Sequence, residues 1–354
     1  RDIWVYGFNK QSVIDNTEMM VNNFNSEINR LKDYEGDKLS QLNQSKDFIS
    51  WSRGLKSVFK KNKEIELTKS NVRLNLYRPF TKKWLYYDPN VIEMSRTFRR
   101  TFGGENEVIL VPGTGSRRSF STLITDKMPD LNILDAGAQG FSRYNNEESE
   151  LLDFDNSNIR KAAANKLNLT EDEAFYYTYG VLHSPDYRVR YSNDLQKSLP
   201  RIPVLENIEK YVEIGRQLAD LHLNYEEVSP PENVTVTFRS ENPSYKVNKM
   251  KHPKVKNEDG KSVKDKSKII FNNEIVVSDI PEKAYGYIVN GKAAIDWIMD
   301  QYKVKIDNNS GIIDDPNSFS EDPKYILNLL LSVINVSMKT LELIDKLPDF
   351  KIVR

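Results

Sequence analysis

The chain has 354 residues, which is enough for two or three domains of about 150 residues each. Its 51 basic residues balance 51 acidic ones, so no overall positive charge indicates binding to nucleic acid. It contains no cysteine and no apolar run of the about 18 residues that a membrane span needs, which excludes disulfides and thiolate metal sites and fits a cytoplasmic protein.

The first 66 residues predict two amphipathic helices. Apolar residues recur at helical spacing over 11–32 and again over 45–61, and the turn residues of 33–37 separate them. The sequence starts at Arg1 rather than at a methionine, and we expect a piece of a longer protein. We interpret residues 1–66 as a helical connector from an upstream domain.

Residues 67–228 predict strands followed by helices. Strand patterns cover 72–77, 84–87, 107–112 and 120–124, with a further one expected within 131–141. Helices are expected over 158–167 and through the stretch from Phe175 to Leu223, where Pro185 can start a second helix. Tyr179 and Leu182 should lie in the core of this helical spine.

Residues 229–354 predict a third segment. It has a strand at 234–238, a hairpin over 268–277, and helices over 284–302 and 322–347, whereas the lysine-rich stretch 249–268 is the most disorder-prone. The expected fold class is α+β: a helical connector, mixed β modules braced by a helical spine, and a long C-terminal helix.

Local charge is more informative than net charge. Residues 51–127 hold 16 basic and 7 acidic side chains, 128–175 hold 4 and 10, and 246–268 hold 9 and 3. Two basic segments separated by an acidic one allow a local face for phosphates, although solvated surface is the ordinary explanation of such runs. The candidate DNA-binding residues are Arg96, Arg99, Arg100, Arg117, Arg118, Lys82, Lys83, Arg188, Arg190, Lys249 and Lys251.

Two motifs resemble enzyme signatures and are better explained otherwise. Leu110–Gly115 has the glycines of a nucleotide loop, but Arg118 replaces the third glycine and a strand follows, which favours a turn presenting Arg117 and Arg118. Asn242–Tyr245 has serine where adenine methyltransferases have a second proline. We predict no catalytic residue, no metal site and no nucleoside triphosphate loop, and we expect the histidines to pack helices.

Several blocks in order resemble the C-terminal target recognition region of type ISP restriction–modification enzymes. They are Trp4–Tyr6, Tyr77–Asp88, Leu182–Pro185, Leu199–Pro203, Ala219–Glu226, Val289–Gly291 and Gly311–Asn317. The resemblance implies recognition of a short site on double-stranded DNA, with a covalently linked adenine methyltransferase, helicase-like motor and nuclease lying outside this chain. It also implies that S-adenosylmethionine, ATP and Mg²⁺ serve those other parts and that this chain needs no cofactor. Two alternatives stay open: an interdomain scaffold without base readout, and a degenerate methyltransferase-like domain.

Overall fold

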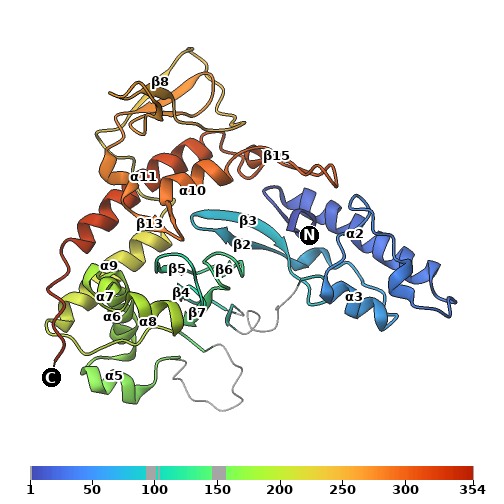
Figure 1. Ribbon diagram of the computed structural model, residues 1–354, viewed down its shortest axis with the longest axis horizontal. Coiled ribbons are helices and arrows are strands. Elements are labelled where there is room, and N and C mark those ends of the chain that lie inside the picture. Colours follow the sequence, from blue (N-terminus) through green and yellow to red (C-terminus); the bar gives the residue numbers. More distant parts are fainter. Residues whose placement is uncertain (1, 93–100, 103, 146–156, 354) are drawn as a thin grey trace. The chain divides into compact units, whose positions relative to one another are not determined.

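The computed structural model divides the chain into two compact units (Figure 1). It describes residues 2–92, 101–102, 104–145 and 157–353. Both units are assembled from segments that lie far apart in the sequence. Unit 1 comprises Arg1–Asn75, Lys82–Arg99 and Lys303–Pro323, and unit 2 comprises Leu76–Thr81, Arg100–Tyr302 and Lys324–Arg354. The sequence analysis instead divided the chain into three segments, with boundaries at 66/67 and 228/229. That division assigns roles within a larger enzyme and stays a prediction.

Unit 1 is built on one long amphipathic helix, as the apolar spacing predicts. Helix α2 begins after Asn9, whose side chain accepts a hydrogen bond from the Ser12 N–H at 2.9 Å, and Val13, Phe24 and Ile28 lie on its buried face. The elements of this unit are α1 (Asp2–Val5), β1 (Tyr6–Gly7), α2 (Lys10–Arg30), η1 (Lys38–Gln41), α3 (Arg53–Lys60), η2 (Lys69–Asn71), β3 (Thr81–Tyr86), β15 (Lys305–Ile306), β16 (Ile313–Asp314) and η4 (Pro316–Ser318).

Helix α3 is shorter than the sequence predicts. It begins at Arg53 rather than near residue 45, because the Ser52 side chain caps it by accepting from the Leu55 N–H at 3.1 Å. The preceding residues are held in an irregular path, in which the Trp51 indole donates to the Asn43 carbonyl at 2.8 Å. Of the expected first two turns, one main-chain turn remains, in which the Ile49 N–H donates to the Ser45 carbonyl at 3.3 Å, and side-chain bonds to the main chain hold the rest.

A late segment of the chain completes unit 1. The Asp314 carboxylate pairs with the Lys83 ammonium and also accepts a hydrogen bond from the Phe8 N–H at 3.1 Å. Phe319 packs edge-on against the Phe8 ring, with 6.1 Å between centroids. Residues near positions 8, 83 and 314 therefore meet in one buried cluster.

In the described part of unit 2 there are four small antiparallel sheets. The tip of the hairpin between β2 (Val72–Arg78) and β3 belongs to unit 2, and β6 (Met128–Pro129) pairs with β2. The central sheet has the order β5-β4-β7, and a second has the order β11-β12-β8. The bounds are β4 (Val108–Val111), β5 (Leu123–Thr125), β7 (Gln139–Ser142), β8 (Thr235–Phe238), β9 (Lys254–Lys256), β10 (Ser262–Lys264), β11 (Ile269–Ile270), β12 (Ile275–Ser278), β13 (Ile288–Val289) and β14 (Lys292–Ala293).

The predicted helical spine forms the core of unit 2. A capping box between Thr170 and Glu173 starts α6, and Pro185 occupies the first turn of α7, as expected. Tyr179 and Leu182 are buried, which confirms their predicted place in the core. The helices are α5 (Lys161–Leu167), α6 (Glu171–His183), α7 (Pro185–Arg190), α8 (Ser192–Lys197), α9 (Ile208–Leu223), α10 (Ala294–Gln301) and α11 (Tyr325–Ile344).

Residues 284–302 do not form the single helix that the sequence predicts. A 3₁₀ turn (η3, Glu282–Tyr285) is followed by the β13–β14 hairpin, and only α10 is helical. Asn290 and Gly291 form the hairpin turn with φ of 49° and 77°, a pair of left-handed residues typical of a tight two-residue connection. The stretch 249–268, expected to be prone to disorder, forms the β9–β10 hairpin.

Helix α11 is long and apolar enough to cross a membrane by length and composition alone. In this fold it is a core helix of unit 2, in contact with α9 and α10. Its buried hydroxyls hydrogen-bond within the protein: the Ser332 hydroxyl lies 2.8 Å from the Val228 carbonyl, and the Thr340 hydroxyl donates to the Val336 carbonyl at 2.7 Å. The mixed α+β class with a long C-terminal helix is confirmed.

Candidate nucleic-acid interface

The turn that follows β4 presents two of the predicted arginines. Strand β4 is buried along its whole length, and the chain leaves it through Gly113 and Gly115. A Cβ at Gly113 would lie 2.0 Å from the Ala136 carbonyl oxygen, so only glycine fits there. Gly115 has a φ of +85°, and its N–H donates to the Gln196 carbonyl at 2.7 Å. The expected glycine turn is therefore present, and no helix follows it.

The Asp135 side chain holds Ser116 and the main chain of Arg117 in place. Its carboxylate accepts from the Arg117 N–H at 2.9 Å and from the Ser116 hydroxyl at 3.0 Å. These bonds hold the pKa of Asp135 below its usual value, with the Arg117 main-chain bond as the largest cause. The side chain of Arg117 itself is exposed.

Arg118 is held by the β13–β14 turn. Its Nη1 donates to the Asn290 carbonyl at 3.0 Å, and the Asn290 N–H donates to the Ser121 hydroxyl at 3.0 Å. A side chain on Gly291 would collide with Arg118, because a Cβ there lies 2.5 Å from Nη1. The Val289–Gly291 block is thus part of the support for this turn. A guanidinium has five N–H donors, so one main-chain bond leaves most of them for another acceptor.

Helix α7 lies next to the same turn. The Arg188 guanidinium lies over the ring of Phe120 at 5.8 Å, and its Nε donates to the Leu182 carbonyl at 2.7 Å. Burial lowers the pKa of Arg188, which marks it as a residue of the spine more than of the surface. Arg190 is exposed, with its guanidinium 5.8 Å from the Tyr191 ring and 5.9 Å from the Phe350 ring. The structure therefore brings the turn with Arg117 and Arg118 to the helix with Arg188.

The remaining candidates lie elsewhere. Lys82 is half-buried on β3, whereas Lys83 is buried, paired with Asp314 and 4.4 Å from the Phe8 ring centroid. This burial argues against a contact between Lys83 and DNA. Lys249 and Lys251 are exposed in unit 2, just before the β9–β10 hairpin. Arg96, Arg99 and Arg100 lie outside the described residues.

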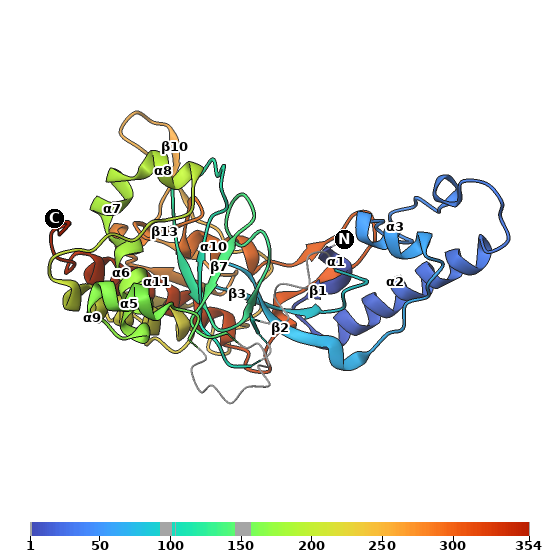
Figure 2. The same cartoon turned by 90° about the horizontal axis from the view of Figure 1, so that it is seen from below.

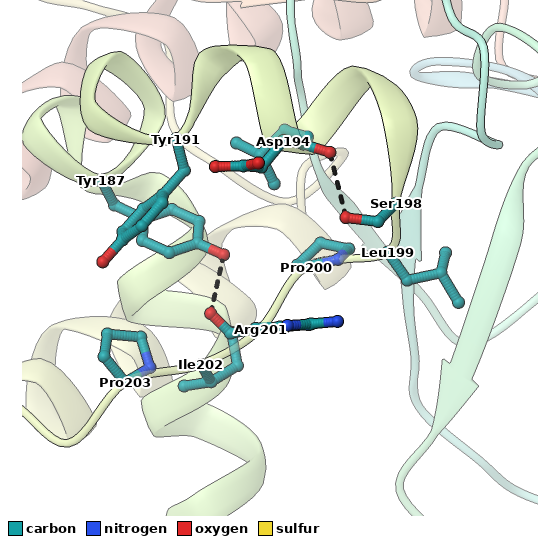
Figure 3. A pocket seen from close by; sticks show the side chains of 10 residues that line it. Tyr187, Tyr191, Asp194, Ser198, Leu199, Pro200, Arg201, Ile202 and Pro203 are labelled. Carbon is teal, nitrogen blue, oxygen red and sulfur yellow. Dashed lines mark hydrogen bonds between the residues drawn. The ribbon is translucent and has the colours of Figure 1, made fainter.

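A separate concave site lies between α7, α8 and the Leu199–Pro203 segment (Figure 3). It has a volume of about 410 Å³. The Tyr187 hydroxyl donates to the Arg201 carbonyl at 3.0 Å, and the Tyr177 hydroxyl donates to the Pro203 carbonyl at 2.8 Å, so the proline-rich segment is fixed to the spine. Of the predicted DNA-binding residues that the structure describes, none lines this cavity.

Of the two enzyme-like motifs, Leu110–Gly115 ends in the glycine turn described above, and Asn242–Tyr245 has no regular secondary structure. Ser244 in the Asn242–Tyr245 quartet is exposed, and its carbonyl accepts from the Asn272 amide at 2.6 Å. Among the described residues, no group of three or more histidine, aspartate or glutamate side chains could hold a metal ion.

The comparisons with known proteins agree with the sequence blocks. The family model for the type ISP C-terminal specificity domain matches residues 1–329. This chain belongs to that family. No curated protein sequence matches it.

Two solved type ISP enzymes have the same fold over the whole chain. The first is a nuclease-deletion mutant of the enzyme LlaGI in complex with a DNA substrate mimic, at 44% identity and a TM-score of 0.89. The second is the ATP-dependent enzyme LlaBIII bound to DNA, at 42% identity and a TM-score of 0.87. The chain covers 27% and 23% of these proteins, and thus spans about a quarter of their length. A DrdV–DNA complex shares the fold at 23% identity and a TM-score of 0.82. The match covers 99% of this chain and 35% of the DrdV chain.

Sequence reasoning missed several residues that support the turn carrying Arg117 and Arg118 in this type ISP specificity domain. Asp135, Gln196 and Asn290 hold the arginine turn from three different elements. Nothing in the local sequence marks Asp135 or Gln196, because their partners Arg117 and Gly115 lie on another segment of the chain. Only the Asn290-Gly291 pair carries a signal, since this dipeptide is typical of a hairpin turn.

Proposed function

We propose that this type ISP specificity domain recognises a short sequence in double-stranded DNA for a single-chain restriction–modification enzyme. One observation carries the proposal: the fold matches LlaGI over 100% of this chain at 44% identity, and LlaGI was solved in complex with a DNA substrate mimic. The adenine methyltransferase, helicase-like motor and nuclease lie in other parts of the enzyme, with their S-adenosylmethionine, ATP and Mg²⁺. Such an enzyme acts in the cytoplasm.

Within this proposal, the turn with Arg117 and Arg118 reads or grips the DNA. Arginine matches the two major-groove acceptors of guanine and also pairs with phosphate. A side chain reads bases well only if its main chain is fixed, and here Asp135 and Gln196 hold the main chain of the turn, while the Asn290 carbonyl holds the Arg118 guanidinium. The exposed Arg190 would add a phosphate contact from α7.

Selection from a randomised duplex library tests this function. We expect the 354-residue chain to enrich one short motif and to bind it in a salt-sensitive way. Changing Arg117 and Arg118 to Ala should weaken binding to the selected duplex by about 10- to 100-fold for each arginine that reads a base, and relax the motif at those positions. Arg160 and Arg239 are exposed arginines of the same unit, and R160A/R239A is the matched control.

The alternatives predict different results. A scaffold without base readout would enrich no motif, and a methyltransferase-like domain would bind S-adenosylmethionine in equilibrium dialysis. Either result would refute the proposed recognition function. If the chain enriches a motif and R117A/R118A leaves that motif unchanged, the recognition function stands and this turn takes no part in it.

A further inference from the structure

The β9–β10 hairpin has two chemically different faces. Lys254 pairs with Lys264, and Val255 pairs with Val263. Residues directly opposite in an antiparallel pair point to the same side, and successive residues alternate. Lys254, Lys264 and Lys256 therefore share one face, and the two valines share the other. Every residue of both strands is exposed.

The hairpin has a defined base and a defined turn. Lys251 and Ile270 exchange two main-chain hydrogen bonds of 3.1 and 2.8 Å, which attach the base to β11. The Asp265 N–H donates to the Pro253 carbonyl at 2.9 Å, and the Asn257 N–H donates to the Lys261 carbonyl at 2.9 Å. Figure 2 shows the loop that joins β9 to β10 projecting from its unit. This is an ordered ribbon rather than a loose lysine-rich loop.

The charges of the ribbon are arranged unfavourably for an isolated protein. Like charges directly opposite each other destabilise a strand pair, and Lys254 faces Lys264. The acidic residues of the segment do not offset this face. Glu258 and Asp259 lie in the turn, and the Asp265 carboxylate at the base accepts from the Ser267 N–H at 3.0 Å. A polyanion laid on the lysine face would relieve the repulsion.

The size of the ribbon fits a groove of DNA. The bonded ladder runs from Pro253 to Asn257 on one strand, and five residues at about 3.4 Å each span about 17 Å. The major groove of B-form DNA is about 12 Å wide and admits a two-stranded ribbon. A ribbon of this length can reach both phosphate backbones across the groove.

We propose that the face formed by Lys254, Lys256 and Lys264 lies across a groove of duplex DNA and neutralises phosphates. This inference rests on the proposed function, because it assumes that the chain binds duplex DNA. It assigns to the ribbon sequence-independent affinity, separate from base readout by the Arg117–Arg118 turn.

The salt dependence of binding to a duplex of arbitrary sequence tests the ribbon. In K254Q/K256Q/K264Q, the slope of log affinity against log salt should become shallower by up to about 2.7, since each phosphate contact contributes about 0.9. Affinity at about 0.1 M salt should fall at least about tenfold. The variant K254R/K256R/K264R keeps the charges and should keep both affinity and slope.

The control variant K166Q/K346Q/K351Q removes three exposed lysines of the same unit outside the ribbon. Equal losses in the control and the ribbon variant would refute the ribbon's role. An unchanged slope in the ribbon variant would also refute the ribbon's role. In that case, the proposed function would still stand if the unmodified chain selects a motif. Failure of the unmodified chain to bind any duplex would refute both. The melting temperature of K254Q/K256Q/K264Q should be equal to or above that of the unmodified chain, which distinguishes weaker DNA binding from unfolding.

Discussion

Two buried histidines in unit 2 illustrate how much a single side chain depends on its partners. The Thr340 hydroxyl donates to the Val336 carbonyl, so its oxygen accepts from His222 Nε2 at 2.9 Å. His222 Nδ1 then accepts from the Tyr179 hydroxyl at 2.6 Å, which defines a neutral ring. His183 donates from Nδ1 to the Tyr179 carbonyl at 2.9 Å, and the two imidazole centroids lie 5.4 Å apart.

Burial sets the protonation of this pair. It lowers the pKa of His222 to about 3 and lowers the pKa of His183 well below its usual value, with the nearby Arg188 charge adding to the effect. The sequence indicated that the histidines pack helices. It could not indicate the hydrogen-bond partners, because Thr340 lies 118 residues from His222.

We expect the chain to be less stable at pH 5 than at pH 7. Unfolded histidine has a pKa of about 6.5, so at pH 5 the unfolded chain binds protons that the folded chain excludes. Stability therefore rises with pH up to about 6.5, and each histidine should lower the free energy of unfolding by about 2 kcal/mol at pH 5. Urea unfolding at the two pH values measures this.

The variant H222Q provides the internal control for that measurement. Its overall stability should fall because a packed ring is removed, but its difference between pH 5 and pH 7 should be about half that of the unmodified chain. Carboxylates with lowered pKa, such as that of Asp172, lose their contribution only at lower pH. Equal free energies of unfolding at pH 5 and pH 7 would contradict the assignment of neutral, buried rings.

At the scale of elements, helices α6 and α9 cross at two glycines. A Cβ at Gly180 would lie 2.4 Å from the Tyr211 carbonyl oxygen, and one at Gly215 would lie 2.0 Å from that of Tyr176. Such short distances mean that the two backbones touch at the crossing. Apolar spacing predicts that both helices exist and which faces are buried. It does not predict a backbone contact of this kind, because a glycine within a helix by itself only lowers helix propensity.

Replacing Gly215 with Ala should force the two helices apart. We expect a loss of about 1–3 kcal/mol or more in the free energy of unfolding, in spite of alanine's higher helix propensity. Chemical unfolding followed by far-ultraviolet circular dichroism measures this loss. Gln217 is exposed on the same helix, and Q217A should be neutral within about 0.5 kcal/mol. A G215A variant as stable as the unmodified chain would show that the crossing is looser than the structure indicates.

At the scale of the whole molecule, the order of elements along the chain is easier to predict than their grouping. Periodicity predicted α2 and α11 to within a few residues, and it placed helices through the stretch that holds α6 and α9. A buried apolar run predicted β4, alternation predicted β8, and two short apolar runs around a turn predicted the β11–β12 hairpin. The assignment of residues 303–323 to unit 1 has no such local signal. It depends on Asp314, whose buried partner Lys83 lies 231 residues earlier in the sequence.

The Lys83–Asp314 pair offers a test of that grouping. K83M should lower the free energy of unfolding of unit 1 by about 3–5 kcal/mol, because it leaves a buried carboxylate without its cation. Three of the four tryptophans, Trp4, Trp51 and Trp84, lie in unit 1, so tryptophan fluorescence follows its unfolding. The double variant K83M/D314N should recover part of the loss. Unchanged unfolding in K83M would show that Asp314 is not buried beside β3.

The interleaving of the two units limits how DNA specificity can be transferred between type ISP enzymes. The chain passes from one unit to the other after residues 75, 81, 99, 302 and 323. A single recombination junction placed between residues 75 and 323 therefore divides at least one unit between two parents. Natural or engineered chimeras should retain function when the whole segment is inherited as one block, or when only surface turns and ribbons are exchanged on an intact framework.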